Sequence, residues 1–370
     1  MIAGKLKRAA ATAALIALGA CADSQPEGGQ PAEQAEAEPT SPEGLRYLSQ
    51  PLVTDIYTAD PSAHLFEDRI YIYASHDIDG TTPEDDLGSH FEMRDYQVLS
   101  MDSVGGPVTI HPVGLDVANV PWAEKQMWAP DAAESNGTYY LYFPAKDSLG
   151  VFRIGVATAD RPEGPFQPQP TPMEGSYSID PAVFTDDDGQ SYLYFGGIWG
   201  GQLQCWATGT YNSQCQRTDH QEDDQPALMP KMAKLSGDML QFAEPVRDAA
   251  IVDEQGQPLL GGDHDRRFFE APWVHKHNGQ YYLSYSTGDT HYIAYATSDS
   301  PYGPFTYRGR VLEPVQGWTN HHSIIEIDGR WYLFYHDTQI SNQTHLRNIK
   351  VTELTHNPDG TIQTVNPFIP

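Results

Sequence analysis

Short segments in which Tyr, Leu and Phe alternate at period two recur through the body of this chain, and polar turn residues bound them. A period of two predicts β-strands, because successive side chains of a strand point to opposite faces of its sheet. No long segment of the body keeps the period of an amphipathic helix. The pattern therefore predicts an all-β protein.

One short strand signature occurs five times in the body of the chain. Each copy is rich in aromatic and aliphatic residues, and an Asn-Gly or Asp-Gly pair stands before four of them. Such pairs favour tight hairpin turns, since both residues tolerate positive φ angles. Each unit thus predicts an inner strand, a tight turn, an aromatic strand and further outer strands. The five runs are 69–73, 137–142, 189–194, 279–283 and 329–333. Five units around one axis predict a five-bladed β-propeller.

A polar residue stands ahead of each aromatic run, and most of these residues are carboxylates. In a radial repeat, equivalent positions of the units surround a single axis, so these side chains are expected to gather at one place. The residues are Asp60, Asp131, Asp180, Glu270 and His321. The repeat therefore predicts both an architecture and the location of a site.

The beginning of the chain has the pattern of an export signal. Basic residues precede an apolar run that ends in Leu-Gly-Ala-Cys. This predicts a lipoprotein signal peptide over residues 1–21 with Cys21 as the lipidated residue, and an ordinary cleaved signal peptide is the alternative. Residues 22–44 are rich in Glu, Gln, Pro and Ser without an aromatic residue, which predicts a disordered acidic tether. Residues 45–370 then form the propeller domain of an exported bacterial lipoprotein, anchored to a membrane in the periplasm or at the cell surface.

The net charge limits the partners that the protein can bind, and the cysteines bear on the compartment in which it works. The 50 acidic residues outnumber the 22 basic ones, for a formal net charge of -28. Such a surface repels phosphate backbones, which excludes nucleic acid as a partner and leaves the lipid anchor as the only membrane contact. Cys205 and Cys215 remain once Cys21 is assigned to the anchor. In an exported protein this pair is expected to form a disulfide, with two free thiols as the alternative.

Three of the axial residues have the chemistry of a glycosidase. Asp60 and Asp180 each precede a proline, and Glu270 stands two residues before one. Hydrolysis of a glycosidic bond needs one protonated carboxyl as acid and one ionised carboxylate as base. A third carboxylate nearby raises the pKa of the acid. An aspartate before a proline also opens turns, which is the structural alternative for each residue alone. Three carboxylates at matching repeat positions favour a catalytic set.

The motifs around these carboxylates, in this order, resemble glycoside hydrolase family 43, the five-bladed propellers that cleave xylosides and arabinosides with inversion. The resemblance covers residues 51 to about 366. It implies that Asp60, in Thr-Ala-Asp-Pro-Ser, is the general base. It implies that Asp180, in Ser-Ile-Asp-Pro-Ala-Val-Phe, modulates the pKa of the acid. Glu270, in Phe-Glu-Ala-Pro-Trp, is then the general acid.

Further motifs resemble the β-xylosidase and α-L-arabinofuranosidase group of that family. Trp128, in Trp-Ala-Pro-Asp, is then an apolar wall for a sugar face, and Asp131 of the same motif is structural. Phe91 and His76 are implied to border the sugar pocket, with ordinary packing at a propeller rim as the alternative. Arg347, in His-Leu-Arg-Asn, is implied to bind sugar hydroxyls, with a surface salt bridge as its alternative.

His321 belongs to an Asn-His-His-Ser motif that resembles the fifth-blade motif of the family. In some members the first histidine lies near the axis and faces a calcium ion surrounded mostly by water. The resemblance thus leaves two interpretations, a structural calcium at the propeller axis and a hydrogen-bonded core histidine. A lone histidine is a weak ligand set for calcium, which prefers about 6 to 8 oxygens. No cofactor is required for the implied chemistry.

The resemblance implies an inverting, exo-acting glycosidase that releases terminal xylose or arabinofuranose from xylan-derived oligosaccharides. The long segment between residues 196 and 268 is expected to close the pocket at one end. An arabinan-degrading enzyme of the same fold is one alternative. Retaining fructan propellers would show Asn-Asp-Pro and Arg-Asp-Pro, where this chain has Ala-Asp-Pro and Ile-Asp-Pro. A non-catalytic surface glycan-binding lipoprotein, the alternative of another class, would lose the acids. An open cleft in place of a closed pocket would make the enzyme endo-acting, and the sequence leaves this choice open, together with the preferred sugar and the oligomeric state.

Overall fold

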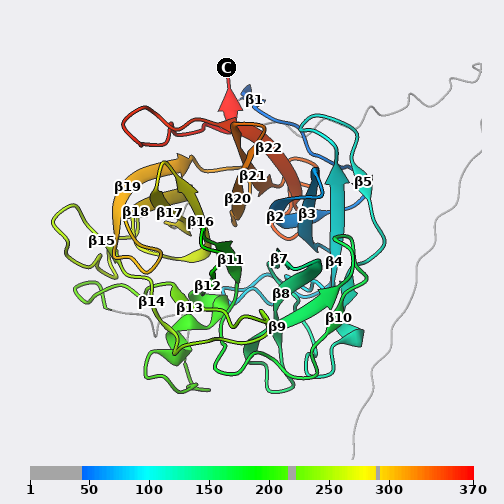
Figure 1. Cartoon of the computed structure of the whole chain (residues 1–370), viewed down its shortest axis with the longest axis horizontal. Helices are drawn as coiled ribbons and strands as arrows, with labels where there is room; N and C mark the ends of the chain where they lie inside the picture. The colour runs from blue at the N-terminus through cyan, green and yellow to red at the C-terminus, as the bar shows by residue number, and fades with distance from the viewer. Residues whose placement is uncertain (1–43, 216–221, 289–291) are drawn as a thin grey trace, which may run out of the picture. The chain divides into compact units, whose positions relative to one another are not determined.

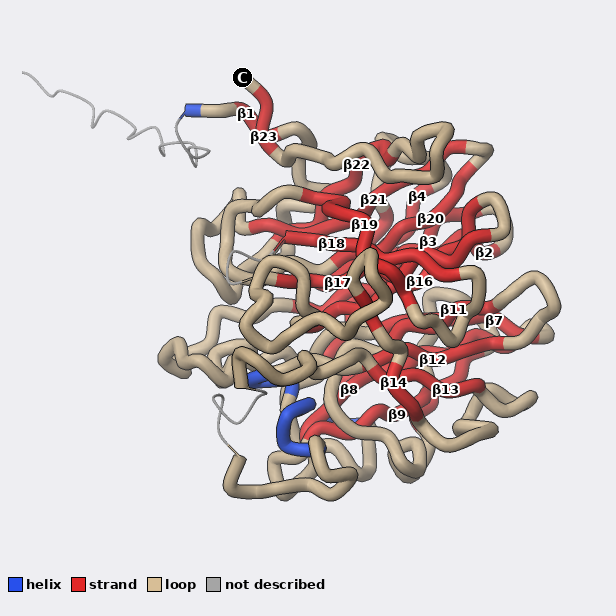
Figure 2. The backbone as a smooth tube through the Cα atoms, turned by 90° about the vertical axis from the view of Figure 1, so that its left-hand side faces the viewer, coloured by secondary structure: helices blue, strands red, loops and turns tan. Residues whose placement is uncertain are grey.

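The computed structural model describes residues 44–215, 222–288 and 292–370, and these residues fold almost entirely into β-strands. Five sheets surround a central axis (Figure 1), which confirms the predicted five-bladed propeller. Figure 2 shows strands throughout and helix only in short turns. The predicted signal peptide, Cys21 and the tether up to residue 43 lie outside the described residues. In the described part of the chain, no helix is long and apolar enough to cross a membrane.

The first three blades are antiparallel sheets whose strands follow one another in chain order. Blade 1 holds β2 (Thr58–Phe66), β3 (Arg69–His76), β4 (Asp95–Met101), β5 (Thr109–Ile110) and β6 (Leu115–Asp116). Blade 2 holds β7 (Asp131–Ser135), β8 (Thr138–Lys146), β9 (Phe152–Ala159) and β10 (Gln167–Pro168). Blade 3 holds β11 (Ala182–Thr185), β12 (Ser191–Phe195), β13 (Lys231–Lys234) and β14 (Arg247–Asp248).

The last two blades complete the ring. Blade 4 holds β16 (Glu270–His277), β17 (Gln280–Thr287), β18 (Tyr292–Ser298) and β19 (Phe305–Leu312), with β15 (Ile251–Val252) parallel to β19. Blade 5 holds β20 (His322–Ile327), β21 (Arg330–Asp337) and β22 (Asn348–Leu354). The inner strand β2 contacts both β20 and β21, which closes the circle between blades 5 and 1. Outside the blades, β1 (Arg46–Tyr47) pairs with β23 (Phe368–Ile369).

The repeated aromatic run is the second strand of every blade, as predicted: β3, β8, β12, β17 and β21. Its residues alternate between the two faces of the blade, and both faces are buried against neighbouring blades. In β12, Leu193 packs into the cluster shared with blade 2, whereas Tyr194 packs into the cluster shared with blade 4. Each interface between neighbouring blades therefore has its own apolar core.

Polar contacts at the axis join the inner strands to one another. The Asp131 carboxylate on β7 accepts hydrogen bonds from Ser62 and His64 on β2 and from the backbone N–H of Val183 on β11. The Ser323 hydroxyl on β20 accepts from the backbone N–H of Ala63 at 3.0 Å. The Asp131 carboxylate thus accepts hydrogen bonds from three residues of the first and third blades. These contacts agree with the structural role expected for it.

Candidate active site

A cavity of about 470 Å³ lies where the inner strands begin, and every blade contributes to its wall. Its lining includes the three predicted catalytic carboxylates together with the predicted Phe91, Trp128, His321 and Arg347. Two loops complete the wall: residues 84–91 between β3 and β4, and residues 198–201 after β12. The latter belongs to the long segment that the sequence predicted to close the pocket.

Proline interrupts the inner strands at the carboxylates. Asp60, Asp180 and Ala271 have φ angles of 53°, 55° and 57°, and each of them precedes a proline. Because proline has no N–H, the ladder cannot continue there, and the register shifts between Ala59 and Ser62 in β2 and between Glu270 and Trp273 in β16. A bulge of this kind turns a side chain away from the regular alternation of the strand. The local sequence thus points these carboxylates into the cavity.

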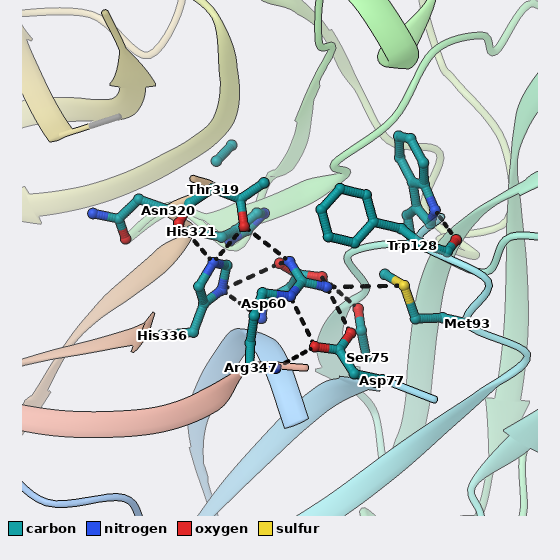
Figure 3. A network of polar contacts seen from close by, with 12 residues as sticks. Asp60, Ser75, Asp77, Met93, Trp128, Thr319, Asn320, His321, His336 and Arg347 are labelled. Atoms are coloured by element: carbon teal, nitrogen blue, oxygen red, sulfur yellow. Dashed lines mark hydrogen bonds and ion pairs between the residues drawn. The ribbon is translucent and has the colours of Figure 1, made fainter. Parts of the chain in front are cut away.

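Asp60 lies at the centre of a polar network (Figure 3). Its Oδ1 accepts from Nη1 of Arg347 at 2.9 Å, and its Oδ2 accepts from the Ser75 hydroxyl at 2.7 Å. Its backbone N–H donates to Nδ1 of His336 at 3.1 Å. Burial acts to raise the pKa of Asp60, but the Arg347 guanidinium and the Ser75 hydroxyl outweigh it and hold the pKa below the usual range. Asp60 is therefore ionised at neutral pH.

Arg347 is held from its other side by Asp77. Nη2 and Nε of Arg347 donate to the two oxygens of Asp77 at 2.7 and 2.9 Å, and the backbone N–H of Arg347 donates to the same carboxylate at 2.8 Å. Arg347 is 3% exposed and its guanidinium lies 4.8 Å from the centre of the Phe91 ring. It is therefore a buried ion-pair residue of the cavity wall and does not form the surface salt bridge that was its alternative interpretation.

Asp180 and Glu270 lie in an environment that favours protonation. Asp180 is buried and its Oδ2 accepts from the backbone N–H of Ala271 at 2.9 Å, which ties it to the residue after Glu270. Burial and the carboxylates of Glu270 and Asp60 raise the pKa of Asp180. Burial and the Asp60 carboxylate raise the pKa of Glu270 to about 8, although Arg347 acts in the opposite direction. The cavity thus combines an ionised carboxylate at Asp60 with a protonated carboxyl at Glu270.

An aromatic wall stands next to Arg347. Nε1 of Trp128 donates to the backbone oxygen of Phe91 at 2.9 Å, and the two rings meet edge to face with 6.1 Å between their centres. Phe152 supports Trp128 from behind at 4.7 Å between ring centres. Both predicted aromatic residues therefore line the cavity, and their rings offer the apolar surface that a sugar face can cover.

The prediction for His76 is wrong. Its Nδ1 lies 2.8 Å from Oδ1 of Asp95, and it is not among the described residues that line the cavity. His76 ends strand β3 and Asp77 directly follows it, and it is Asp77 that reaches the network around Arg347. The residue that follows His76 therefore takes the place in the cavity network that the sequence assigned to His76.

His321 lines the cavity, and its Nε2 lies 3.9 Å from Oδ2 of Asp180. Burial lowers the pKa of His321, so the ring is neutral at neutral pH. Calcium prefers a cage of about 6 to 8 oxygens. The described residues contain no group of three or more His, Cys, Asp and Glu side chains that could hold a metal ion. The residues at His321 therefore do not fit a calcium ion held by protein ligands.

Cys205 and Cys215 form a disulfide, with 5.4 Å between their Cα atoms. Cys205 lies in the short helical turn η4 (Leu203–Trp206), which is one residue away from η3 (Trp199–Gly201) of the cavity wall. Gly200 packs so closely that an added Cβ would lie 2.6 Å from the backbone oxygen of Leu87. The covalent bridge and the close packing together fix the loop that closes one side of the cavity.

Several residues of the cavity wall were not found by sequence reasoning. Trp199 and Trp318 come from loops with no repeat signal, and Glu84, Asp85 and Asp86 belong to an acidic stretch that reads as a solvated loop. The acidic stretch adjoins the motif that contains Phe91, which was the only signal for it. With these residues, the described part of the cavity wall holds six carboxyl side chains and one arginine, which is itself paired with carboxylates.

A propeller that gathers an ionised carboxylate, a protonated carboxyl and aromatic walls around one cavity defines a glycoside hydrolase. The chain belongs to glycosyl hydrolases family 43, whose family model matches residues 50–362. The family membership expected from the motifs is thereby confirmed.

The chain is similar to characterised members of this family over nearly their whole length. It is 58% identical to xylosidase/arabinosidase 43A of Humicola insolens, over 86% of this chain and 99% of the relative. It is 65% identical, with a TM-score of 0.86, to a β-xylosidase/α-arabinofuranosidase from a compost microbial metagenome, solved with xylotriose in a calcium-free form, covering 88% of this chain and 100% of the other. A Xanthomonas citri enzyme complexed with xylose is 58% identical with a TM-score of 0.82, over 87% and 94% of the two chains.

Proposed function

We propose that this glycosidase releases a terminal xylose or arabinofuranose from xylan-derived oligosaccharides by a single displacement that inverts the anomeric carbon. The observation that carries the proposal is the contrast between Asp60, whose pKa is lowered, and Glu270, whose pKa is raised to about 8, on one cavity. Pairs of carboxyls with opposed protonation are the signature of an acid and a base acting on one bond.

In the proposed reaction Asp60 takes a proton from a water molecule while the water oxygen attacks the anomeric carbon. The bond to the leaving oxygen breaks, and Glu270 gives that oxygen its proton. Arg347, clamped by Asp77, fixes the direction of the Asp60 carboxylate. Asp180 is tied to the backbone next to Glu270, so it orients the acid and its burial near Glu270 disfavours a second negative charge. His321 is assigned no step.

The form of the cavity supports exo action on a neutral sugar. The loops before Phe91 and around Trp199 both line it, so a terminal residue is enclosed on several sides. Among the described residues of the wall, Arg347 is the one arginine, and it is paired with the carboxylates of Asp60 and Asp77, which disfavours an acidic substrate. The similar proteins include xylosidase/arabinosidases, and one of them was solved with xylotriose. Xylose and arabinofuranose therefore stand as two substrates of one site.

The proposed function is tested by following xylotriose hydrolysis with proton NMR. We expect xylose to appear first as the α-anomer and then to mutarotate, because inversion at a β-xyloside gives the α-configuration. Aryl β-xyloside and aryl α-L-arabinofuranoside, each assayed with and without a chelator, compare the two sugars and the effect of a metal ion. Initial formation of β-xylose would contradict the single displacement. No release of monosaccharide from any of these substrates would contradict the function itself.

The activity is expected to depend on pH through the same two carboxyls. The reaction requires Asp60 ionised and Glu270 protonated, so kcat/KM falls as the pH rises through about 8, where Glu270 loses its proton. On the acid side it falls only below the usual range of carboxyl groups, since the pKa of Asp60 is lowered. Initial rates across the pH range measure both limbs. An alkaline limb that persists in Glu270→Gln would belong to another group.

A further inference from the structure

A second group of aromatic rings lines the cavity, separate from the wall of Phe91 and Trp128. Trp199 and Trp318 lie nearly parallel, with 5.9 Å between ring centres and 27° between ring planes. Phe269 meets both edge to face, at 5.1 Å from Trp199 and 6.3 Å from Trp318. Trp318 is 40% exposed, whereas Trp128 of the first wall is 8% exposed. The second group therefore presents a large ring to the open side of the cavity.

The second aromatic group is attached to the proton donor. Phe269 directly precedes Glu270, and its backbone oxygen accepts from the backbone N–H of Ile198 at 2.9 Å, which fixes the loop of Trp199 to the same strand. The first wall, in contrast, adjoins Arg347 and through it Asp60. In a single displacement the water and the leaving group occupy opposite sides of the anomeric carbon. The leaving sugar begins at the oxygen that Glu270 protonates, so it extends along the rings next to Glu270.

Trp199 is held in an unusual backbone conformation. Its φ angle is 54°, in the left-handed region that a bulky residue rarely adopts. Such conformations cost free energy and persist where the surrounding structure requires them, often in ligand sites. Here the strained residue is the one that stacks on Trp318. The ring that backs Trp318 is therefore held by the structure around it.

We propose that Trp318, backed by Trp199 and Phe269, is the platform that binds the leaving sugar next to the cleaved bond; this rests on the proposed function. The chemical class is a xylopyranosyl unit. Its ring carries no exocyclic carbon, so its C–H groups form a flat face that suits the electron-rich face of an indole. The same unit leaves when a terminal xylose or an arabinofuranosyl branch of xylan is removed. One platform therefore serves both terminal sugars.

The test compares two xylosyl substrates with different leaving groups. Xylotriose places a xylopyranosyl unit on the platform, whereas β-xylopyranosyl fluoride has a single atom as its leaving group and cannot use it. In Trp318→Ala we expect kcat/KM for xylotriose to fall about tenfold, the loss of one good stacking contact, while the fluoride loses far less. Trp318→Phe, which keeps an aromatic face, should recover most of the loss. Leu149→Ala removes an apolar side chain that is 83% exposed away from the cavity and is the matched control.

A binding measurement separates this proposal from the proposed function. In Glu270→Gln, titrations with xylose and with xylobiose compare occupation of the terminal site alone with occupation of both sites. Adding Trp318→Ala should weaken xylobiose binding about tenfold and leave xylose binding almost unchanged. An equal loss of affinity for xylose and xylobiose, or no loss of affinity for xylobiose, would contradict the proposed role of Trp318. If the wild type binds xylobiose but releases no sugar, the proposed function is wrong. The titrations would then still show whether Trp318 binds the second xylose unit.

Discussion

Glu270→Gln is expected to lower kcat on xylotriose by about 10²–10⁴-fold, the range in which a positioned proton donor contributes. Glutamine has nearly the same shape as glutamic acid but cannot give a proton to the leaving oxygen. An aryl xyloside with a strongly acidic phenol as its leaving group departs without that proton, so its rate should fall much less. Steady-state kinetics on the two substrates measure the difference.

The contrast between substrates distinguishes a lost acid from a damaged site. Glu326→Gln, which changes an exposed residue of β20, is the matched control and should leave both rates unchanged. Equal losses on xylotriose and on the aryl xyloside would mean that Glu270 does not act as the acid. Glu270 is neutral in the wild type, and glutamine is neutral as well. The thermal unfolding temperature of the variant should therefore stay close to that of the wild type.

Asp60→Asn is expected to lower kcat by about 10²–10⁴-fold on both kinds of substrate, since activation of water is needed whatever group leaves. The amide cannot take a proton, and it offers Arg347 a neutral partner in place of a carboxylate. Asp77 still binds two nitrogens of the Arg347 guanidinium, so the arginine keeps one ion pair and the fold should persist. Circular dichroism and thermal unfolding check that the variant is folded.

Azide offers a direct measurement of the missing base. The azide anion attacks the anomeric carbon without giving up a proton, while the leaving oxygen still takes its proton from Glu270. Activity of Asp60→Asn on an aryl β-xyloside should therefore rise with azide concentration and yield the α-xylosyl azide. Asp160→Asn, which alters an exposed aspartate directly after β9, should show neither the loss nor the gain. Recovery of a β-azide, or a loss on xylotriose alone, would contradict the role of base.

Local sequence patterns were sufficient to predict most of the fold. In β12, apolar residues stand at consecutive positions, so apolar side chains point to both faces of the blade. Leu193 and Tyr194 show this, since each packs into a different apolar cluster. The Asn136-Gly137 pair adopts φ angles of 53° and 77°, the hairpin turn expected before an aromatic strand. These signals act within a few residues, so they can be read without knowledge of the neighbours in space.

Reasoning from the sequence reached part of the candidate site. The three carboxylates stood out because each has a proline in its motif and recurs at a repeat position, and all three line the cavity. The sequence pointed to His76 and not to Asp77, because the direction of a side chain where β3 ends depends on contacts with residues far along the chain, here Arg347. Trp318 lies in a loop without a periodic pattern, so nothing in the sequence marked it.

By itself the sequence determined the class of fold, the number of blades and the positions of the carboxylates, because each follows from periods and turns over short stretches. Only the tertiary structure decided what those carboxylates do. The ion pair that holds Asp60 ionised comes from Arg347, which is 287 residues away along the chain. The burial that keeps Glu270 protonated comes from several blades at once. Protonation depends on distance and burial in space, and the ring of blades sets both.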